Sequence, residues 1–340
     1  MTKLALITGA AGYIGSHACV KLIEDGYSII AFDNFSNGKR ENLARVFEVA
    51  GTDFPIVEGD VRFISDLKEI DKYGVPDIAF HFAGLKSVNE SICLPEKYYD
   101  VNVFGSLVLA RYLAEVGCRN LVFSSSATVY GDSEQDLISE CSAINPTNPY
   151  GRSKHMAENV LSDICMAQGI TLASLRYFNP IGAHPSGLIG EDPCGIPNNL
   201  LPYLVRVASG QYDCLNVYGS DWNTEDGTGV RDYIHVMDLV DGHIAAANYI
   251  MTSKTSLTVN LGTGKGTSVL QLISAFEAAT GTGVKKQHVA RRSGDIARAV
   301  ANPEFAANVL EWTSSRTVLE ACADSWRWQM QIRNKGGSDG

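Results

Sequence analysis

The sequence predicts an α/β protein with a doubly wound parallel sheet and a smaller C-terminal α/β domain that binds substrate. Through the first 180 residues, short apolar runs rich in β-branched residues alternate with longer amphipathic stretches, a pattern typical of βαβ units. A glycine-rich turn follows the first apolar run. After about residue 180 turn-rich segments interrupt the pattern, which predicts a smaller, loop-rich second region.

Each apolar run of the first 180 residues is expected to form one strand of the sheet. The strands are predicted at residues 4–8, 28–33, 54–58, 77–82, 120–125 and 171–177. Helices are predicted at residues 14–25, 40–50, 65–73, 97–116 and 149–168, and again at 237–251, 269–280 and 316–333. Because right-handed βαβ connections bring the carboxyl ends of parallel strands to one edge, we expect ligands to bind there.

The length of 340 residues suggests about two domains. We expect residues 1–180 to form a cofactor-binding domain, and residues 181–340 to form mainly the substrate-binding domain. This prediction leaves open that segments at about 231–260 belong to the first domain.

The composition argues against several classes of protein. The 28 Lys and Arg residues against 38 Asp and Glu residues give a net charge of −10, with no basic cluster for nucleic acid. No apolar stretch approaches the roughly 20 residues of a membrane span, and the N-terminus lacks a signal-peptide pattern. The eight cysteines are scattered without metal-ligand spacing, so we expect free thiols, no metal site and a cytoplasmic location.

A glycine turn links the first predicted strand to the first predicted helix. Gly9, Gly12 and Gly15 form a G-x-x-G-x-x-G pattern. Glycine lets the backbone turn sharply and approach a pyrophosphate, and the helix N-terminus offers free N–H groups to the phosphates. Together with the alternating strands, this turn predicts a Rossmann-type dinucleotide-binding fold.

An acidic residue closes the second predicted strand. Asp33 follows Gly15 by about 20 positions, where a carboxylate accepts hydrogen bonds from an adenosine ribose. The same charge repels a 2′-phosphate, which favours NAD over NADP. Lys39 and Arg40 stand close by in the sequence and leave this choice open.

A tyrosine and a lysine mark the expected reacting group. Tyr150 and Lys154 open the fifth predicted helix and lie one turn apart on the same face. A phenol is a poor base at pH 7, but a neighbouring ammonium and a nicotinamide cation favour the phenolate and lower its pKa. Ser126, at the end of the preceding strand, is expected to share the proton, although Ser124 and Ser125 compete for this role.

Longer motifs resemble one group of enzymes across about residues 3–330. A resemblance to the extended short-chain dehydrogenase/reductases rests on the glycine turn, the run 124–131 (SSSATVYG), the Tyr150-x-x-x-Lys154 pair and the run 176–180 (RYFNP). A narrower similarity to the UDP-glucose 4-epimerase family rests on the runs 82–86 (FAGLK), 182–185 (GAHP), 195–200 (GIPNNL), 227–236 (GTGVRDYIHV) and 294–295 (GD).

The resemblance implies an NAD-dependent isomerase that interconverts UDP-galactose and UDP-glucose through a transient 4-keto sugar. NAD is expected to stay bound and to be regenerated in every cycle. By similarity, Tyr150 takes the proton of the sugar 4-OH while the C4 hydride leaves. Lys154 would hold the pKa of the tyrosine down and contact the nicotinamide ribose, and Ser126 would be the proton partner.

The same resemblance implies two sets of ligand-binding residues. NAD is expected to contact Gly9, Gly12, Tyr13, Ile14, Gly15, Asp33, Asn34, Asp60, Val61, Phe82, Ala83, Gly84, Lys86, Asn102, Ser124, Tyr150, Lys154, Tyr177 and Phe178. The UDP-sugar is expected to contact Lys86, Ser126, Tyr150, Asn179, Asn199, Leu200, Asn216, Tyr218, Arg231, Tyr233, Arg292, Asp295 and Ala299.

One substrate position carries a small residue. Ala299 stands where members restricted to UDP-glucose and UDP-galactose resemble one another in carrying a bulky Tyr. A methyl group in place of a phenol leaves space for an acetamido group, unless a neighbour such as Arg298 closes it. We therefore expect UDP-GlcNAc and UDP-GalNAc to be substrates as well.

Two other functions share parts of this pattern. A nucleotide-sugar 4,6-dehydratase would use the same fold, NAD and Tyr/Lys pair, but its relatives resemble one another in a Thr-Asp-Glu triplet that is Ser-Ala-Thr at 126–128 here. A non-catalytic NAD-binding regulator would not need the Tyr/Lys pair. Family resemblance also implies a homodimer, built through the helices predicted at 97–116 and 149–168.

Overall fold

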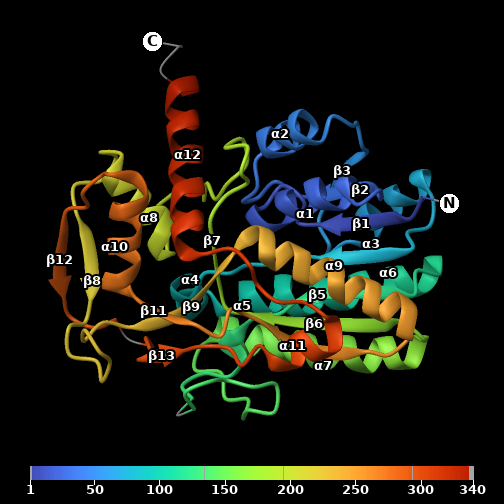
Figure 1. Ribbon diagram of the computed structural model, residues 1–340. Helices are drawn as coiled ribbons and strands as arrows, with labels where there is room; N and C mark the ends of the chain where they lie inside the picture. Colours follow the sequence, from blue (N-terminus) through green and yellow to red (C-terminus); the bar gives the residue numbers. More distant parts are fainter. Residues whose placement is uncertain (1, 134, 194, 293, 337–340) are drawn as a thin grey trace.

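A seven-stranded parallel sheet forms the centre of the computed structural model, which describes residues 2–133, 135–193, 195–292 and 294–336 (Figure 1). Its strand order is β3-β2-β1-β4-β5-β6-β10. The strands are β1 Leu4–Thr8, β2 Ser28–Asp33, β3 Ile56–Glu58, β4 Ile78–His81, β5 Asn120–Ser124, β6 Thr171–Tyr177 and β10 Leu257–Leu261. From β1 the chain runs outward to β2 and β3 and then returns to β4 on the other side of β1, which confirms the predicted Rossmann-type sheet.

Helices cover both faces of this sheet because its strands bury side chains on both sides. Ile7 of β1 belongs to the core on one face, and its neighbour Leu6 belongs to the core on the other. The first face is covered by α1 Tyr13–Glu24, α2 Arg40–Ala50 and α9 Val236–Ser253. The second face is covered by α3 Ile64–Lys68, α6 Gly105–Val116 and α7 Pro149–Gln168.

A smaller α/β region lies to one side of the main sheet (Figure 1). It contains a four-stranded sheet of β7 Asn179–Ile181, β9 Val230–His235, β11 Gly266–Ser268 and β13 Arg298–Ala299, and a parallel pair of β8 Leu215–Tyr218 and β12 Lys286–Val289. Three helices, α8 Leu200–Ala208, α10 Val269–Thr280 and α12 Val318–Gly336, pack around these strands. Their buried side chains, among them Leu204 and Phe276, form a separate core.

Part of the C-terminal half belongs to the main sheet. Strand β10 pairs with β6 in parallel, and α9 packs against β5 and β6. Helix α11 Glu304–Leu310 packs on β10 and α9. The chain therefore crosses from the small region to the main sheet and back.

Several elements differ from the expected ones. The helix expected at 97–116 consists of α5 Pro95–Tyr98, a π-helical stretch Tyr99–Phe104 and α6, and the helix expected at 65–73 divides into α3 and a 3₁₀ stretch Glu69–Tyr73. The helices α8 and α11 of the second half were not expected. In the first 180 residues, two short pieces were not expected: α4 Val88–Cys93 and a 3₁₀ turn Ala127–Val129. Both short pieces start at a serine cap, Ser87 and Ser126, and are too short to produce a helical period in the sequence.

The structure also bears on the expectations about membrane spans, thiols and metal sites. Within the described ranges, each helix is too short or too polar to cross a bilayer. Seven cysteines are free thiols in the structure, and the eighth, Cys194, lies outside the described residues. No group of three or more His, Cys, Asp or Glu side chains among the described residues is arranged to hold a metal ion.

Candidate active site

One cavity of about 620 Å³ lies at the carboxyl ends of the central strands and reaches into the small region. Its volume falls within the range of about 300–1,000 Å³ that is typical of ligand sites. The lining includes, from the expected residues, Gly9, Gly12, Tyr13, Ile14, Gly15, Phe82, Gly84, Lys86, Ser126, Tyr150, Lys154, Tyr177, Phe178, Asn179, Asn199, Leu200, Asn216, Tyr218, Arg231, Tyr233, Arg292, Asp295 and Ala299. The structure therefore brings most of the two expected residue sets together around one space.

The glycine turn at this cavity leaves no room for side chains. Gly9 has φ +72°, and a Cβ placed on it would lie 2.6 Å from the backbone nitrogen of Ala83. A Cβ on Gly15 would lie 2.1 Å from the carbonyl oxygen of Gly9. Helix α1 begins after Gly12 without a side-chain cap, so the N–H groups of its first turn are available to the cavity. These features fit the pyrophosphate of a dinucleotide.

Asp33 supports this turn from behind the cavity lining. Its Oδ2 accepts a hydrogen bond from the backbone N–H of Ala11 (2.9 Å), and its Oδ1 accepts one from the N–H of Phe35 (2.8 Å). Burial raises the pKa of Asp33, and these amides oppose that rise. Each carboxylate oxygen keeps a second lone pair, so the group can hold the turn and still accept a ribose hydroxyl.

The two cations near Asp33 are already paired with acidic side chains. Lys39 Nζ lies 2.5 Å from Asp192 Oδ2, and Arg40 forms an ion pair with Glu58. Lys39 and Arg40 therefore offer little free positive charge to a 2′-phosphate, which agrees with the expected preference for NAD.

Other expected cofactor residues also lie outside the cavity lining and contact one another. Asn34 donates to Asp60 Oδ2 (2.9 Å), and Asp60 pairs with Arg62. Burial alone would raise the pKa of Asp60, but hydrogen bonds from Arg62 and Asn34 lower it to about 2. The remaining members of this set are Val61, Ala83, Asn102 and Ser124.

Asn102 shapes the loop at the end of β4. Its Oδ1 accepts from the N–H of Leu85 (2.8 Å), and its Nδ2 donates to the carbonyl oxygen of Leu85 (3.1 Å) and to Ser153 Oγ (3.0 Å). The π-helical stretch carries this amide to the loop, and Gly84 leaves space for it, because a Cβ there would lie 3.1 Å from Asn102 Oδ1. Asn102 thus positions the cofactor loop through its backbone.

Tyr150 and Lys154 project from the first turns of α7 into the cavity. The helix starts at Pro149, with Asn148 as its cap accepting from the N–H of Gly151 (2.9 Å). Lys154 Nζ donates to the carbonyl oxygen of Ser124 (2.8 Å). This start and this anchor fix both side chains on one face of the helix.

Among the three competing serines, Ser126 lines the cavity. Ser125 donates to Glu158 Oε1 (2.5 Å), and the hydroxyl of Ser124 approaches His243 Nε2 at 3.5 Å. Ser126 accepts from the N–H of Thr128 (3.2 Å), which orients its hydroxyl. The geometry therefore favours Ser126 over its two neighbours as the proton partner.

Burial dominates the ionisation of the reacting pair. It raises the pKa of Tyr150 above the ordinary value, and the Ser126 hydroxyl opposes this. It lowers the pKa of Lys154 to about 8, and the charge of Glu158 opposes this. The lowering of the Tyr150 pKa expected from Lys154 is therefore outweighed in the protein alone, because both groups are removed from water.

The substrate side of the cavity carries two arginines in different environments. Arg292 lies over the ring of Tyr218 (4.4 Å to the centroid), and its Nε donates to Asp295 (3.0 Å). Arg231, on β9, is half-buried and donates to the carbonyl oxygen of Val230 (2.8 Å). Planar guanidinium groups suit a diphosphate. Arg292 occupies one face of the ring of Tyr218, which is one of the expected substrate contacts.

A family model for the NAD dependent epimerase/dehydratase family matches residues 5–262 of the chain. The chain belongs to this family. The UDP-glucose 4-epimerase of Bacillus subtilis is 48% identical over 325 residues, which cover 95% of this chain and 96% of that protein. The UDP-glucose 4-epimerase of Stenotrophomonas maltophila, solved with NAD and formylated UDP-arabinopyranose, has a TM-score of 0.95 and 42% identity and covers 98% of this chain and 100% of that one. The epimerase of Bifidobacterium longum, solved with NAD⁺ and UDP, has a TM-score of 0.93 and 42% identity, with coverage of 98% and 99%.

Membership of the epimerase/dehydratase family makes NAD the cofactor of this chain. The glycine turn, Asp33 and the loop 82–86 are the parts of the structure that fit it.

Glu191 and Trp222 are two of the cavity residues that were not predicted from the sequence. Glu191, whose side chain is only 8% exposed, pairs with Lys86 (2.7 Å) and accepts from Asn199 Nδ2 (2.9 Å). Trp222 lines the cavity beside Tyr218 and donates to its carbonyl oxygen (3.4 Å). The local signal for each was its residue type alone: Glu191 is a carboxylate and Trp222 an aromatic residue, each inside a turn-rich run.

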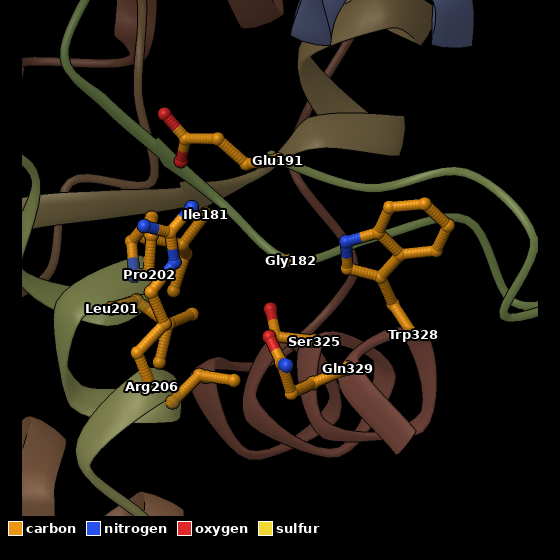
Figure 2. Close-up of a pocket in the computed structure, with 10 residues that line it drawn as sticks. Ile181, Gly182, Glu191, Leu201, Pro202, Arg206, Ser325, Trp328 and Gln329 are labelled. Carbon is orange, nitrogen blue, oxygen red and sulfur yellow. The ribbon is translucent and has the colours of Figure 1, made fainter. Parts of the chain in front are cut away.

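A second, much smaller cavity lies between α8 and α12 behind Glu191 (Figure 2). Its volume of about 20 Å³ is close to that of a single water position. Figure 2 shows Arg206, Ser325 and Trp328 around it. The small cavity is therefore a packing gap of the small region, and the ligands of this family fit only the large one.

Replacement of Gly15 by alanine should prevent cofactor retention. Its Cβ would meet the carbonyl oxygen of Gly9, so the turn must open. We expect NAD released per chain on denaturation to fall below about a tenth of the wild-type value. Gly283→Ala is the matched control, because a Cβ at Gly283 meets nothing within 4 Å. Full NAD content in Gly15→Ala would contradict this role of the turn.

Proposed function

We infer that this enzyme interconverts UDP-galactose and UDP-glucose with tightly bound NAD. The observation that carries this function is the meeting of Tyr150, Lys154 and Ser126 with the glycine turn and Arg231 in one cavity. Relatives that match almost the whole chain at 47–48% identity are UDP-glucose 4-epimerases.

The reaction follows from the groups that line the cavity. NAD, held by the glycine turn, Asp33 and the loop 82–86, would supply a hydride acceptor for the sugar C4 and a positive ring that favours a nearby phenolate. Tyr150 takes the proton of the 4-OH, Ser126 shares that proton, and the Lys154 ammonium holds the phenolate by charge. The 4-keto sugar turns over about its diphosphate link before the hydride and the proton return.

We propose that the two halves of the chain divide this work. Residues 1–180 hold NAD through the glycine turn, Asp33 and the loop 82–86, and residues 181–340 hold mainly the UDP-sugar. The proposed substrate contacts from the second half are Asn199, Leu200, Asn216, Tyr218, Arg231, Tyr233, Arg292, Asp295 and Ala299, and Asn179 of β7 adds one more; all of them line the cavity. Asn179 comes from the junction of the two halves.

Removal of the phenol hydroxyl should stop the reaction without emptying the site. In Tyr150→Phe we expect kcat to fall by about 10²–10⁴-fold, because the general base is lost. NAD content and UDP affinity should stay at their wild-type values, since the ring and its packing remain. Turnover within a few-fold of wild type would show that another group takes the proton.

We propose that UDP-GlcNAc and UDP-GalNAc are also substrates. Ala299 lines the cavity with only a methyl group and pairs with Arg231 across β13 and β9. Arg298, the neighbour that could close this space, directs its Nε to the carbonyl oxygen of Asp136 (3.3 Å). The space beside Ala299 can therefore hold an acetamido group.

Filling that space should separate the two substrate pairs. Ala299→Tyr is expected to lower kcat/KM for the N-acetyl sugars by about 10- to 200-fold, while kcat/KM for UDP-glucose and UDP-galactose changes little. Ala299→Ser is the matched control, because it adds a single atom. Equal loss on both pairs, or no N-acetyl turnover by the wild type, would overturn this specificity.

We propose that the enzyme is a homodimer formed through the segment 97–116, which contains the π-helical stretch and α6, and through α7. Large apolar side chains are exposed on α4, the π-helical stretch and α7, which pack together, and on the link between α4 and α5: Ile92, Leu94, Phe104 and Met156 are 44–54% exposed. Exposed apolar groups that gather on one surface are typical of protein interfaces. We also propose a cytoplasmic location, which the free thiols support.

The assembly can be tested by charging this surface. Wild-type protein should elute as a dimer across micromolar concentrations in light scattering with size exclusion. Phe104→Glu/Met156→Glu should elute as a monomer with an unchanged circular dichroism spectrum, because two carboxylates cannot be buried between identical faces. Leu319→Glu, at an apolar position 49% exposed on α12, is the control and should leave the dimer intact. A monomeric wild type would contradict the proposal.

A further inference from the structure

A buried ion pair lies beneath the reacting group. Glu158 on α7 and Arg176 on β6 are 7% and 8% exposed. Arg176 Nε donates to Glu158 Oε1 (2.9 Å), and its Nη2 donates to Oε2 (2.8 Å), so the pair is bidentate. Neither side chain lines the large cavity, and the reaction described above does not use them.

The ion pair is part of a longer buried network. Arg176 Nη1 donates to the hydroxyl of Tyr130 (3.1 Å), which in turn donates to Asn260 Oδ1 (2.7 Å) on β10. Asn260 Nδ2 donates to the carbonyl oxygen of Ile138 (2.9 Å). The carboxylate of Glu158 is thereby held by a network that reaches from β6 to β10, and it cannot move freely.

Glu158 lies near Lys154 in the helix and contacts the serine segment 124–126. It lies four residues after Lys154, one turn along the same face of α7. It also accepts from Ser125 Oγ, and Ser125 stands between Ser124, whose carbonyl oxygen holds Lys154, and Ser126. One carboxylate therefore contacts the segment that anchors the lysine and the segment that carries the proton partner.

We propose that Glu158 is a positioning residue that keeps the Lys154 ammonium charged and holds the serine segment 124–126 under Tyr150. This role rests on the proposed function, because it concerns the same Tyr/Lys pair. Arg176 holds the carboxylate in the bidentate geometry that lets it serve both purposes.

The charges around Lys154 support this role. The titratable groups that face it are Tyr150 and Glu158 on its own helix and His81 on β4, and the Phe123 ring of β5 lies 5.1 Å from its Nζ. Burial lowers the pKa of His81 to about 3, so this imidazole is neutral. Glu158 is the negative group that opposes the effect of burial on the pKa of Lys154.

Removal of the Glu158 carboxylate is expected to lower the pKa of Lys154. Without the carboxylate, the pKa of Lys154 falls below its value of about 8, and the ammonium is lost at a lower pH. The phenolate then loses its neighbouring cation in the alkaline range. The alkaline limb of the kcat/KM profile should therefore move to lower pH.

The variant must not leave Arg176 buried without a partner, since an unpaired buried charge is strongly destabilising. The test therefore uses Glu158→Gln/Arg176→Gln, which removes both charges. Glu158→Met/Arg176→Met is a second version, because a well-packed apolar pair often replaces a buried ion pair without loss of stability. Wild type and variants are assayed with UDP-galactose from pH 6 to 10, with NAD content and thermal unfolding measured in parallel.

Because the charge of Glu158, and not that of Arg176, is what opposes burial at Lys154, we expect the alkaline limb of either double variant to lie up to about one pH unit below that of wild type. At pH 8.5 this lowers kcat/KM by up to about tenfold, and at pH 6.5 the shift itself changes kcat/KM by less than about twofold. Glu158→Asp keeps the charge and should keep the limb at its wild-type position, even where turnover falls. A limb that superimposes on wild type in a folded, NAD-containing double variant would overturn the proposal.

A control separates this effect from general loss of stability. Asp238 is 1% exposed and pairs with Arg316 far from the Tyr/Lys pair, so Asp238→Asn/Arg316→Gln also removes a buried carboxylate. It should lower the unfolding temperature and leave the alkaline limb in place. A limb that moves equally in this control would overturn the proposal, whereas absence of turnover in wild type would instead refute the proposed function.

Discussion

The backbone of the glycine turn lies in direct contact with the end of β4, and this contact sets the ligand edge of the sheet. The α-carbon of Gly9 is so close to Ala83 that a Cβ would clash, and its N–H donates to the carbonyl oxygen of Phe32 at the end of β2 (2.8 Å). Three strand ends are thereby joined by backbone alone. Asp33 then ties the same turn to β2 through Ala11. Because these contacts involve no long side chain, the phosphate cradle and the loop after β4 keep a fixed separation.

A chain of hydrogen bonds between buried side chains connects β1 to the cofactor loop after β4. Thr8 Oγ1 contacts His81 Nδ1 (2.8 Å), His81 Nε2 contacts Ser106 Oγ (2.9 Å), and Ser106 donates to the carbonyl oxygen of Asn102 (2.6 Å). The side-chain amide of Asn102 then makes hydrogen bonds with both the N–H and the carbonyl oxygen of Leu85. Burial lowers the pKa of His81 to about 3, so the line positions the loop without adding a charge beneath the reacting group.

Local pattern explains which parts could be predicted from the sequence. The main strands and the glycine turn follow from short-range alternation and spacing, and Asp33 follows from its distance to that turn. The small sheet was missed because β9 pairs with β7, β11 and β13, three short segments far apart in the chain with no alternation of their own. Glu191 was missed for the same reason, since its partners Lys86 and Asn199 come together only in the folded chain. The balance of burial against charge at Tyr150 also depends on the folded surroundings.

The cavity shows how a chain of net charge −10 can bind a dianionic diphosphate. Arg292 is partly neutralised by Asp295 and lies on the ring of Tyr218, so its contribution is chiefly to orient that ring. Arg231 is the more buried of the two, and burial lowers its pKa, although a guanidinium stays protonated at neutral pH. A cation that has lost part of its hydration gains most when an anion arrives, because the anion restores the stabilisation that water no longer supplies. We therefore propose the half-buried Arg231, carried on the central strand of the small sheet, as the charge on which diphosphate affinity depends most.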